Sequence, residues 1–324
     1  MNSSRLNPRL SIVIPTHNRP DLLRLCLQSV VRYAPEGAEI IVVDDGSREG
    51  CAGSAMQEFP QVRGVRGRRS RGFCAAANAG IRIARAVVVQ MLNDDTEVTS
   101  NWAEPALAWL EDPSVASVSP LVLRKTSKHA SRPEIDSAGD RYYLGGVAGK
   151  RGRGQPLGAD YLQSDRVFGA SACSAFFRRD ILLRLGGFPE SFGAYFEDVD
   201  LAFRINRAGY RVIYEPKSCV WHRGHSSYGT YRRQLLQQQS RNEERVFWRN
   251  IPRSAWRQAV PRHLAVLAGK ALRRLGEGQL VPFLCGRLQV LGEIRNLKRH
   301  HQLLNQIGPA GELTDWKVEP HYWA

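Results

Sequence analysis

Residues 86–96, AVVVQMLNDDT, are the stretch from which the fold of this chain follows most directly. An apolar run of strand length is followed at once by side chains that carry oxygen, those of Asn93, Asp94 and Asp95. A continuous apolar run of this length is typical of a strand whose two faces are both covered. We therefore expect a buried strand that ends where these polar side chains begin.

The same arrangement occurs twice upstream. The apolar residues 10–15 (LSIVIP) precede a polar cluster at 16–18, and residues 39–43 (EIIVV) precede another at 44–47. Residues 19–33, between these two strands, have helical spacing. Alternation of strands and helices predicts a parallel, doubly wound α/β sheet. Ligands of such sheets bind at the carboxyl ends of the strands, so the polar clusters are expected to share one site.

Composition limits the class of protein. The chain has 324 residues, of which 43% are hydrophobic and 24% charged, as in ordinary globular proteins, but its net charge is +15. This excess predicts a polyanionic partner, such as nucleotide phosphates, an anionic membrane face or nucleic acid. The six cysteines are scattered without a C-x-x-C pair, which fits a reducing compartment. With no secretory signal and no membrane-spanning apolar run, we expect a cytoplasmic protein, with the inner face of the cell membrane as a possible place.

The last third of the chain differs from the rest. Residues 231–250, 255–275 and 280–307 have the spacing of successive helices. From His222 to the end there are 17 Lys and Arg against 7 Asp and Glu, so +10 of the net charge of +15 lies there. Basic helices with aromatic residues suit a membrane interface, although a solvated helical appendage is an equal alternative. The aromatic residues in question are Trp248, Trp256, Trp316 and Trp323.

The polar cluster at the end of the third strand is a candidate metal site. Asn93 and Asp95 project to one side of the strand and Asp94 to the other. Two oxygen ligands at the end of a strand can hold Mg²⁺ or Mn²⁺ together with a substrate diphosphate. The alternative is a strand that simply ends in a turn closed by Asn and Asp side chains.

Two further clusters are candidates for chemistry. Residues 196–201 (FEDVDL) place three acids at the start of a helix, where the helix dipole alone favours acidic residues. A carboxylate among aromatic side chains is partly desolvated, which raises its pKa and suits a general base. His222 follows another predicted strand and could complete the shell of a metal ion, or serve the structure alone.

The order of these motifs resembles one family. P-T-x-N at 15–18, V-V-D-D-G-S at 42–47, R-G-F-x-x-A-x-N-x-G at 71–80, L-N-D-D-T at 92–96, G-G-F at 186–188, F-E-D-V-D-L-x-x-R at 196–204, G-Y at 209–210 and W-H at 221–222 occur in register. Together they resemble family-2 glycosyltransferases of the GT-A fold, particularly the rhamnosyltransferase-like bacterial members. The resemblance covers about residues 9–228. It implies a catalytic domain over 1–228 and a basic helical region over 229–324.

The resemblance also implies an activity. Such enzymes are inverting glycosyltransferases, which move a sugar from a nucleotide-diphosphate donor to a hydroxyl of a glycan or lipid-linked acceptor. The rhamnosyltransferase-like character makes dTDP-rhamnose a candidate donor. A divalent metal, Mg²⁺ or Mn²⁺, is implied as cofactor. Residues 169–173 are expected on the acceptor side.

The resemblance assigns roles to individual residues. Asp198 is the expected catalytic base and Glu197 the less favoured candidate, while Asp95 and His222 are the expected metal ligands. The first acid of the metal motif is replaced here by Asn93, which removes one potential metal contact. Residues expected to contact the nucleotide sugar are Pro15, Thr16, Asn18, Asp44, Asp45, Arg71, Asn78 and Asp94.

Two other classes of protein remain as alternatives. A sugar-nucleotide-binding module without strong catalysis would keep the fold and fit the altered metal motif. A nucleic-acid-binding protein is suggested by charge alone. However, the chain has no helix-turn-helix, zinc-finger or RNP pattern, and its acidic clusters would repel a phosphate backbone. We therefore expect no nucleic-acid partner.

Overall fold

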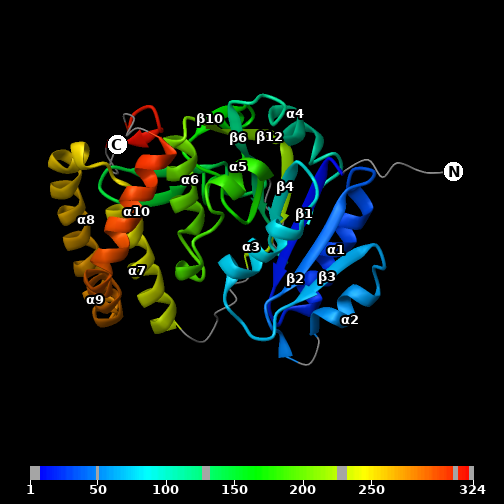
Figure 1. The fold of residues 1–324 in the computed structure, drawn as a ribbon, viewed down its shortest axis with the longest axis horizontal. Helices are drawn as coiled ribbons and strands as arrows, with labels where there is room; N and C mark the ends of the chain where they lie inside the picture. Colours follow the sequence, from blue (N-terminus) through cyan, green and yellow to red (C-terminus); the bar gives the residue numbers. More distant parts are fainter. Residues whose placement is uncertain (1–7, 49–50, 126–131, 225–231, 309–312, 321–324) are drawn as a thin grey trace.

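The computed structural model describes residues 8–48, 51–125, 132–224, 232–308 and 313–320. Within them, ten strands form one central sheet, which lies to the right of the C-terminal helices in Figure 1. Eight strands follow each other in the order β10-β12-β6-β11-β4-β1-β2-β3, while β5 pairs with β12 and β7 with β6. Their bounds are β1 Leu10–Thr16, β2 Glu39–Asp44, β3 Val62–Arg66, β4 Val88–Leu92, β5 Thr96–Val98, β6 Val115–Arg124, β7 Ile135–Ser137, β10 Asp165–Val167, β11 Ser174–Arg178 and β12 Arg211–His222.

The sheet is mostly parallel. β1 pairs in parallel with both β2 and β4, and β2 with β3, so the three strands expected from the sequence lie side by side. β11 runs antiparallel between β4 and β6. Every residue of β1, β2 and β4 is buried, in agreement with their unbroken apolar sequences. The polar clusters that follow these strands therefore meet at one edge of the sheet.

Helices cover both faces of the sheet. In β1, Leu10, Ile12 and Ile14 belong to one hydrophobic core and Val13 to the other, as the alternation of a strand requires. The first core is closed by α1 (Pro20–Tyr33) and α4 (Glu104–Trp109), and the second by α3 (Phe73–Ile83), α5 (Arg179–Arg184) and α6 (Glu197–Arg207). α2 (Cys51–Gln57) lies beside α1.

The helix α3 packs unusually close to the sheet. A Cβ atom at Gly80 would lie 2.3 Å from Cγ1 of Val13, so no larger residue fits there without movement of the strand. The neighbouring helix positions are alanines and a cysteine, which keep the same approach possible. The small-residue character of this segment thus has a packing cause.

A second, smaller sheet lies beside the first. It consists of β8 (Asp140–Tyr143), β9 (Val147–Lys150) and β13 (Val318–Glu319), and β8 and β9 form an antiparallel pair. β13 belongs to the C-terminal region, and it pairs in parallel with β8. The end of the chain is thereby attached to the hairpin that follows β7.

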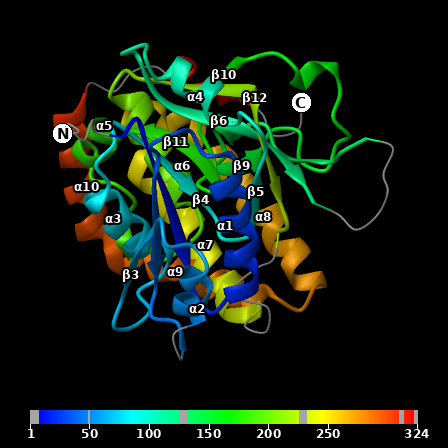
Figure 2. The ribbon, with the colours of Figure 1, turned by 90° about the vertical axis from the view of Figure 1, so that its right-hand side faces the viewer.

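Four helices form the C-terminal region. They are α7 (Arg232–Asn250), α8 (Trp256–Gly276), α9 (Leu280–Gln289) and α10 (Ile294–Ile307). Figure 1 shows them at the end of the molecule opposite β2 and β3, and Figure 2 shows α7 and α9 behind the sheet. The single helix expected over 280–307 is wrong, because a 3-10 turn over Val290–Glu293, which contains the poor helix former Gly292, separates α9 from α10. The expected domain boundary at 228–229 lies outside the described residues and stays a prediction.

Candidate active site

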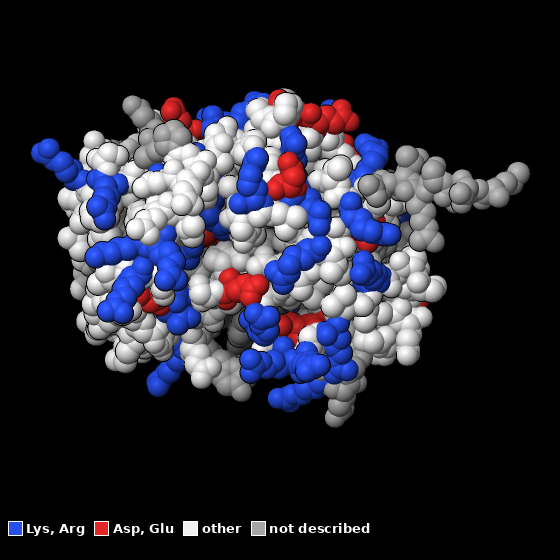
Figure 3. Space-filling model, in the orientation of Figure 1, with Lys and Arg blue, Asp and Glu red and all other residues white. Residues whose placement is uncertain are grey.

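A cleft with a volume of about 1010 Å³ lies at the carboxyl edge of the sheet. Figure 3 shows the surface hollowed between the C-terminal helices and the strands β1 to β3, with basic side chains on both sides of the hollow. The predicted residues that line the cleft are Pro15, Thr16, Asp45, Asp94, Asp95, Glu197, Asp198 and His222. Side chains from the C-terminal helices form part of the same wall, among them Leu236, Ser240, Lys270 and Arg273.

His222 lies between two carboxylates at one part of the cleft. β12 pairs with β5 so that His222 stands opposite Thr96, which brings the imidazole to Asp95. Its Nε2 lies 3.2 Å from Oδ1 of Asp95, and its Nδ1 lies 3.0 Å from Oδ2 of Asp136. Burial opposes a charge on the imidazole, but Cys173, Asp136 and Asp95 outweigh that effect and raise the pKa of His222 to about 12.

The geometry of Asp95 and His222 fits a divalent ion. Two ligand atoms bound at right angles to one ion, each at about 2.0–2.1 Å, lie roughly 3 Å apart. The 3.2 Å between Nε2 of His222 and Oδ1 of Asp95 is close to that separation, but it is also the distance of an ion pair between the two groups, so His222 must release its proton before it can bind a metal ion. No group of three or more His, Cys, Asp and Glu side chains suited to a metal ion occurs among the described residues.

Asp94 lines the same cleft as Asp95 and shares one cationic partner with it. The Thr16 hydroxyl donates to Oδ2 of Asp94 at 2.7 Å, and Arg19 donates to Oδ1 at 3.0 Å. Arg19 also reaches Oδ2 of Asp95 at 3.4 Å, so one guanidinium contacts both acids. Burial raises the pKa of Asp94 despite the opposing effect of Arg19, whereas His222 and Arg19 outweigh burial at Asp95 and lower its pKa.

A second acidic group lies at the start of α6. Oδ2 of Asp198 accepts a hydrogen bond from the backbone N–H of Ala172 at 3.3 Å, which places it against the segment 169–173. Its Oδ1 accepts from the N–H of Val199 at 2.9 Å. Within the described part of the chain, Oε2 of the neighbouring Glu197 is buried and has no hydrogen-bond partner.

These acids titrate as a cluster with Asp140 of β8. Burial and the proximity of Asp198 raise the pKa of Asp140 to about 8 and that of Glu197 well above its usual value. Burial also raises the pKa of Asp198, while Lys150 of β9 and two backbone N–H groups oppose the shift. A carboxyl group whose pKa is raised by burial is a stronger base than an exposed one, which suits a group that must accept and release a proton.

The third acid of the motif, Asp200, serves the structure. It is fully buried and is bound by Arg204 at 2.9 Å and by the amide of Asn250 at 3.0 Å. Arg249 lies 3.3 Å away, and these charges outweigh burial and lower the pKa of Asp200. Asp200 therefore joins α6 to α7 instead of facing the cleft.

The acids follow a strained turn. Tyr195 and Phe196 have φ values of 71° and 67°, in the left-handed region, which costs a non-glycine residue about 1–2 kcal/mol. The Asn242 amide of α7 donates to the carbonyl oxygens of Phe192, Ala194 and Tyr195 at 2.9, 3.0 and 3.0 Å. Gln238, one helical turn earlier, donates to two of the same oxygens. Side chains of α7 thus hold the turn that positions Glu197 and Asp198.

Asp45 and Asp44 have different environments. The Asp45 carboxylate lines the cleft and accepts hydrogen bonds from the Ser70 hydroxyl and from the backbone of Arg71 and Gly72, each at 2.7–2.8 Å. Asp44 is buried outside the cleft, and its Oδ1 accepts from the backbone N–H of Ser47 at 2.8 Å. Asp45 is therefore the acid of this pair that a ligand in the cleft can reach.

Three other predicted residues also lie outside the cleft lining. Asn18 binds Ser47 and Arg48, Asn78 binds the backbone of Phe188, and Arg71 pairs with Glu190 at 2.7 Å. These contacts connect the loops around the cleft to one another. Their expected contacts with a nucleotide sugar stay predictions.

The cleft contains charged residues that the sequence did not indicate. Outside the C-terminal helices, they are Arg19, Arg124, Asp136, Asp140, Lys150 and Arg153. Most come from the glycine-rich segment 124–166, where no periodic pattern marks them. Arg19 had a weak signal, since it stands directly before the first helix and next to the predicted donor segment.

Known proteins share this sequence pattern. The family described as glycosyl transferase family 2 matches residues 11–186. The uncharacterized protein y4gI of Sinorhizobium fredii is 30% identical over 238 residues, 68% of this chain but only 25% of that protein, so this chain spans about a quarter of that relative's length. The N-acetylglucosaminyl-diphospho-decaprenol L-rhamnosyltransferase of Mycobacterium tuberculosis is 27% identical over 69% of this chain and 78% of its own length.

Solved structures share the fold. The mannosyltransferase PcManGT of Pyrobaculum calidifontis, in complex with GDP-Man and Mn²⁺, matches 93% of this chain and 85% of its own with a TM-score of 0.55. The two sequences are 20% identical, so this likeness concerns the fold alone. The expected GT-A fold is thereby confirmed.

Replacing Asn242 by Leu should destabilise the protein by about 1–3 kcal/mol, because the carbonyl groups of the strained turn lose their buried donor. Urea denaturation measures this change. The exposed Gln234 on the same helix provides a control, since Gln234→Leu is expected to change stability by less than about 0.5 kcal/mol. Equal losses in the two variants would show that the turn does not depend on the Asn242 amide.

Proposed function

We propose that this chain, which belongs to glycosyl transferase family 2, is a glycosyltransferase that inverts the configuration of the sugar it transfers. The proposed donor is a nucleotide-diphosphate sugar and the proposed acceptor a hydroxyl of a glycan or of a lipid-linked sugar. One observation carries this proposal. Asp95 with His222, and Asp198 with Glu197, come from distant parts of the sequence and line the same cleft.

The nucleotide is proposed to lie beside β1 and β2. Pro15, Thr16 and Asp45 line that end of the cleft, and Asp94 lies next to Thr16. The complex of PcManGT with GDP-Man supports a nucleotide-sugar donor. dTDP-rhamnose is the first donor to test, since the relative from Mycobacterium tuberculosis is an L-rhamnosyltransferase.

Asp95 and His222 are the proposed ligands of Mg²⁺ or Mn²⁺. When bound, such an ion offsets the negative charge that develops on the departing diphosphate. Arg19 holds both Asp94 and Asp95, which fixes the direction of their carboxylates. Asp136 binds the far nitrogen of His222 at 3.0 Å and orients the imidazole, a common arrangement behind a metal-binding histidine.

Asp198 is the proposed catalytic base. Two backbone N–H groups donate hydrogen bonds to its oxygens. Burial raises the pKa of Asp198, which makes its carboxylate a stronger base. The acceptor hydroxyl would transfer its proton to Asp198 as its oxygen attacks the anomeric carbon from the face opposite the diphosphate. A single displacement of this kind inverts the configuration. Glu197 is less favoured, since burial and Asp198 raise its pKa well above the usual value and so oppose its ionised form.

The helical region 229–324 is proposed to belong to the catalytic unit. α7 holds the turn before the acids, and α7 and α8 contribute side chains to the cleft. No helix in the part of the chain that the structure describes is long and apolar enough to cross a membrane.

The same region is proposed to contact an anionic membrane surface. Nine large apolar side chains are exposed there, and they are Leu264, Leu272, Leu275, Val281, Leu284, Leu288, Leu291, Ile294 and Leu303. The surrounding excess of positive charge complements anionic lipid and opposes association with a second copy of the chain. Among the tryptophans expected to contribute, Trp316 is buried in the core, whereas Trp248 and Trp256 are half-buried and pack against it, so their membrane contact stays a prediction. Trp323 lies outside the described residues.

Asp198→Asn should lower the turnover of a nucleotide sugar by roughly 10²–10⁴-fold, because the base is lost. Release of nucleoside diphosphate from a donor panel measures turnover. Donor binding, followed by thermal shift, should persist. The exposed acid Asp180 gives a matched control, Asp180→Asn, which should leave turnover unchanged. Normal turnover in Asp198→Asn would refute the base, and a wild type that binds donors without turnover would favour the binding-module alternative.

Removal of metal with EDTA should stop turnover, and Mn²⁺ or Mg²⁺ should restore it, since the diphosphate then regains its counter-charge. Mn²⁺ binding followed by electron paramagnetic resonance should weaken in Asp95→Asn by at least about tenfold relative to Asp180→Asn. Full turnover in EDTA by protein shown to carry no metal would contradict the metal assignment.

The wild type should float with vesicles that contain phosphatidylglycerol at low salt and bind them less at 1 M salt, where charges are screened within about 3 Å. Leu272→Ser with Leu275→Ser should weaken flotation roughly tenfold or more, because each buried leucine contributes about 1.5–3 kcal/mol. Val87→Ser with Leu162→Ser, which removes exposed apolar side chains elsewhere, is the control. Absence of flotation by the wild type would end the membrane proposal.

A further inference from the structure

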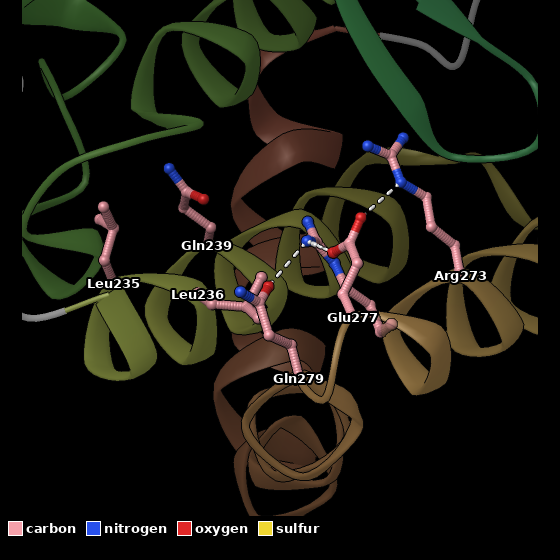
Figure 4. A pocket seen from close by; sticks show the side chains of 7 residues that line it. Leu235, Leu236, Gln239, Arg273, Glu277 and Gln279 are labelled. Carbon is pink, nitrogen blue, oxygen red and sulfur yellow. Dashed lines mark hydrogen bonds and ion pairs between the residues drawn. The ribbon is translucent and has the colours of Figure 1, made fainter.

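A second pocket, which we call the side pocket, opens between α7 and the turn from α8 to α9. Its volume is about 550 Å³. Figure 4 shows Leu235, Leu236 and Gln239 of α7 on one side and Arg273, Glu277 and Gln279 on the other. Arg274 completes the lining.

The side pocket is continuous with the large cleft. Leu236, Gln239, Arg273 and Arg274 line both of them. Figure 1 shows α6, which carries Asp198, between the C-terminal helices and the strands β1 and β2. When a donor is bound beside β1 and β2, the side pocket is therefore still available to an acceptor. It can take the part of the acceptor that extends beyond the reacting hydroxyl.

The side pocket has an excess of positive charge. Arg273 and Arg274 share a single carboxylate, that of Glu277, through Nε of Arg273 at 2.8 Å and Nη1 of Arg274 at 2.5 Å. The Arg273 side chain is 77% exposed, and no hydrogen bond to its two terminal nitrogens occurs among the described residues. One carboxylate balances only one of the two guanidinium groups. A guanidinium with its terminal N–H groups available suits the paired oxygens of a phosphate or carboxylate.

The side pocket also has an apolar wall. Leu235 and Leu236 of α7 line it. A bare inorganic anion would leave this wall without a partner. A ligand that joins a phosphate to an apolar group would contact both kinds of side chain.

We propose that the side pocket binds the phosphate group of the acceptor, with an apolar segment of the same molecule against Leu235 and Leu236. This proposal rests on the proposed function, because it names the chemistry of the acceptor for that reaction. Arg273 and Arg274 contact the phosphate oxygens, and the Glu277 carboxylate competes with the phosphate for the two guanidinium groups. The acceptor hydroxyl then extends from the side pocket toward Asp198.

Titration calorimetry with hexyl phosphate, a single phosphate on a short apolar chain, tests the proposal on the full chain. We expect the wild type to bind hexyl phosphate at least tenfold more tightly than inorganic phosphate or hexyl glucoside. Arg273→Gln with Arg274→Gln should weaken hexyl phosphate binding at least tenfold. Glu277→Gln should tighten it several-fold, a change that a folding defect cannot produce. Arg257→Gln, an exposed arginine of α8 outside the side pocket, should change nothing.

Three results would overturn the proposal. Equal binding of hexyl phosphate by the double arginine variant and the wild type would exclude the arginines. Equal affinity of the wild type for inorganic and hexyl phosphate would exclude the apolar contact. Loss of vesicle flotation in the double variant with unchanged hexyl phosphate binding would assign the arginines to the membrane surface. Donor turnover is measured on the same proteins, so a wild type that binds hexyl phosphate but turns over no nucleotide sugar would refute the proposed function separately.

Discussion

The constraint on which this site depends is the repulsion among carboxylates gathered at one edge of a sheet. Asp94, Asp95, Asp136, Asp140, Glu197 and Asp198 all line a single cleft. Around Asp95 and Asp136, the charges of His222, Arg19 and Lys150 outweigh burial and lower the pKa of each carboxyl group. Around Glu197, Asp198 and Asp140, the charge of Lys150 and backbone N–H groups at Glu197 and Asp198 oppose burial, but burial outweighs them and the pKa of each carboxyl group rises. The cleft thus has a part that stays anionic and a part that exchanges protons.

That division matches what transfer from a diphosphate requires. The anionic part can hold a cation beside a leaving group, while the proton-exchanging part can accept a proton from an attacking hydroxyl. Lys150 lies between the two parts, since it contacts Asp136 at 3.4 Å and acts on the pKa of Asp198 and Asp140. The hairpin of β8 and β9 therefore contributes to the chemistry as well as to the wall.

Much of this arrangement was predictable because it is local in sequence. Unbroken apolar runs predicted β1, β2 and β4, and each polar cluster follows its strand directly. The choice between Asp44 and Asp45 was not predictable, because it depends on the loop 70–72 that Asp45 binds. The same holds for three other cleft residues, Asp136, Asp140 and Lys150, which could not be predicted. Their segment has no periodic pattern, and its position depends on pairing with β6 and β13. Asn242 looks like any polar residue of a basic helix until its three carbonyl partners are known.

The dependence of the left-handed turn on α7 has a consequence for how such enzymes diversify. The side-chain amides of Gln238 and Asn242 hold the backbone before Glu197 and Asp198. Both belong to α7, which follows the last strand of the central sheet in the chain. Substitutions in α7 can therefore change the orientation of the Glu197 and Asp198 carboxylates, while the residues that face the sugar stay the same. Through such a helical extension, natural selection can change the reaction by substitutions far from the reacting atoms.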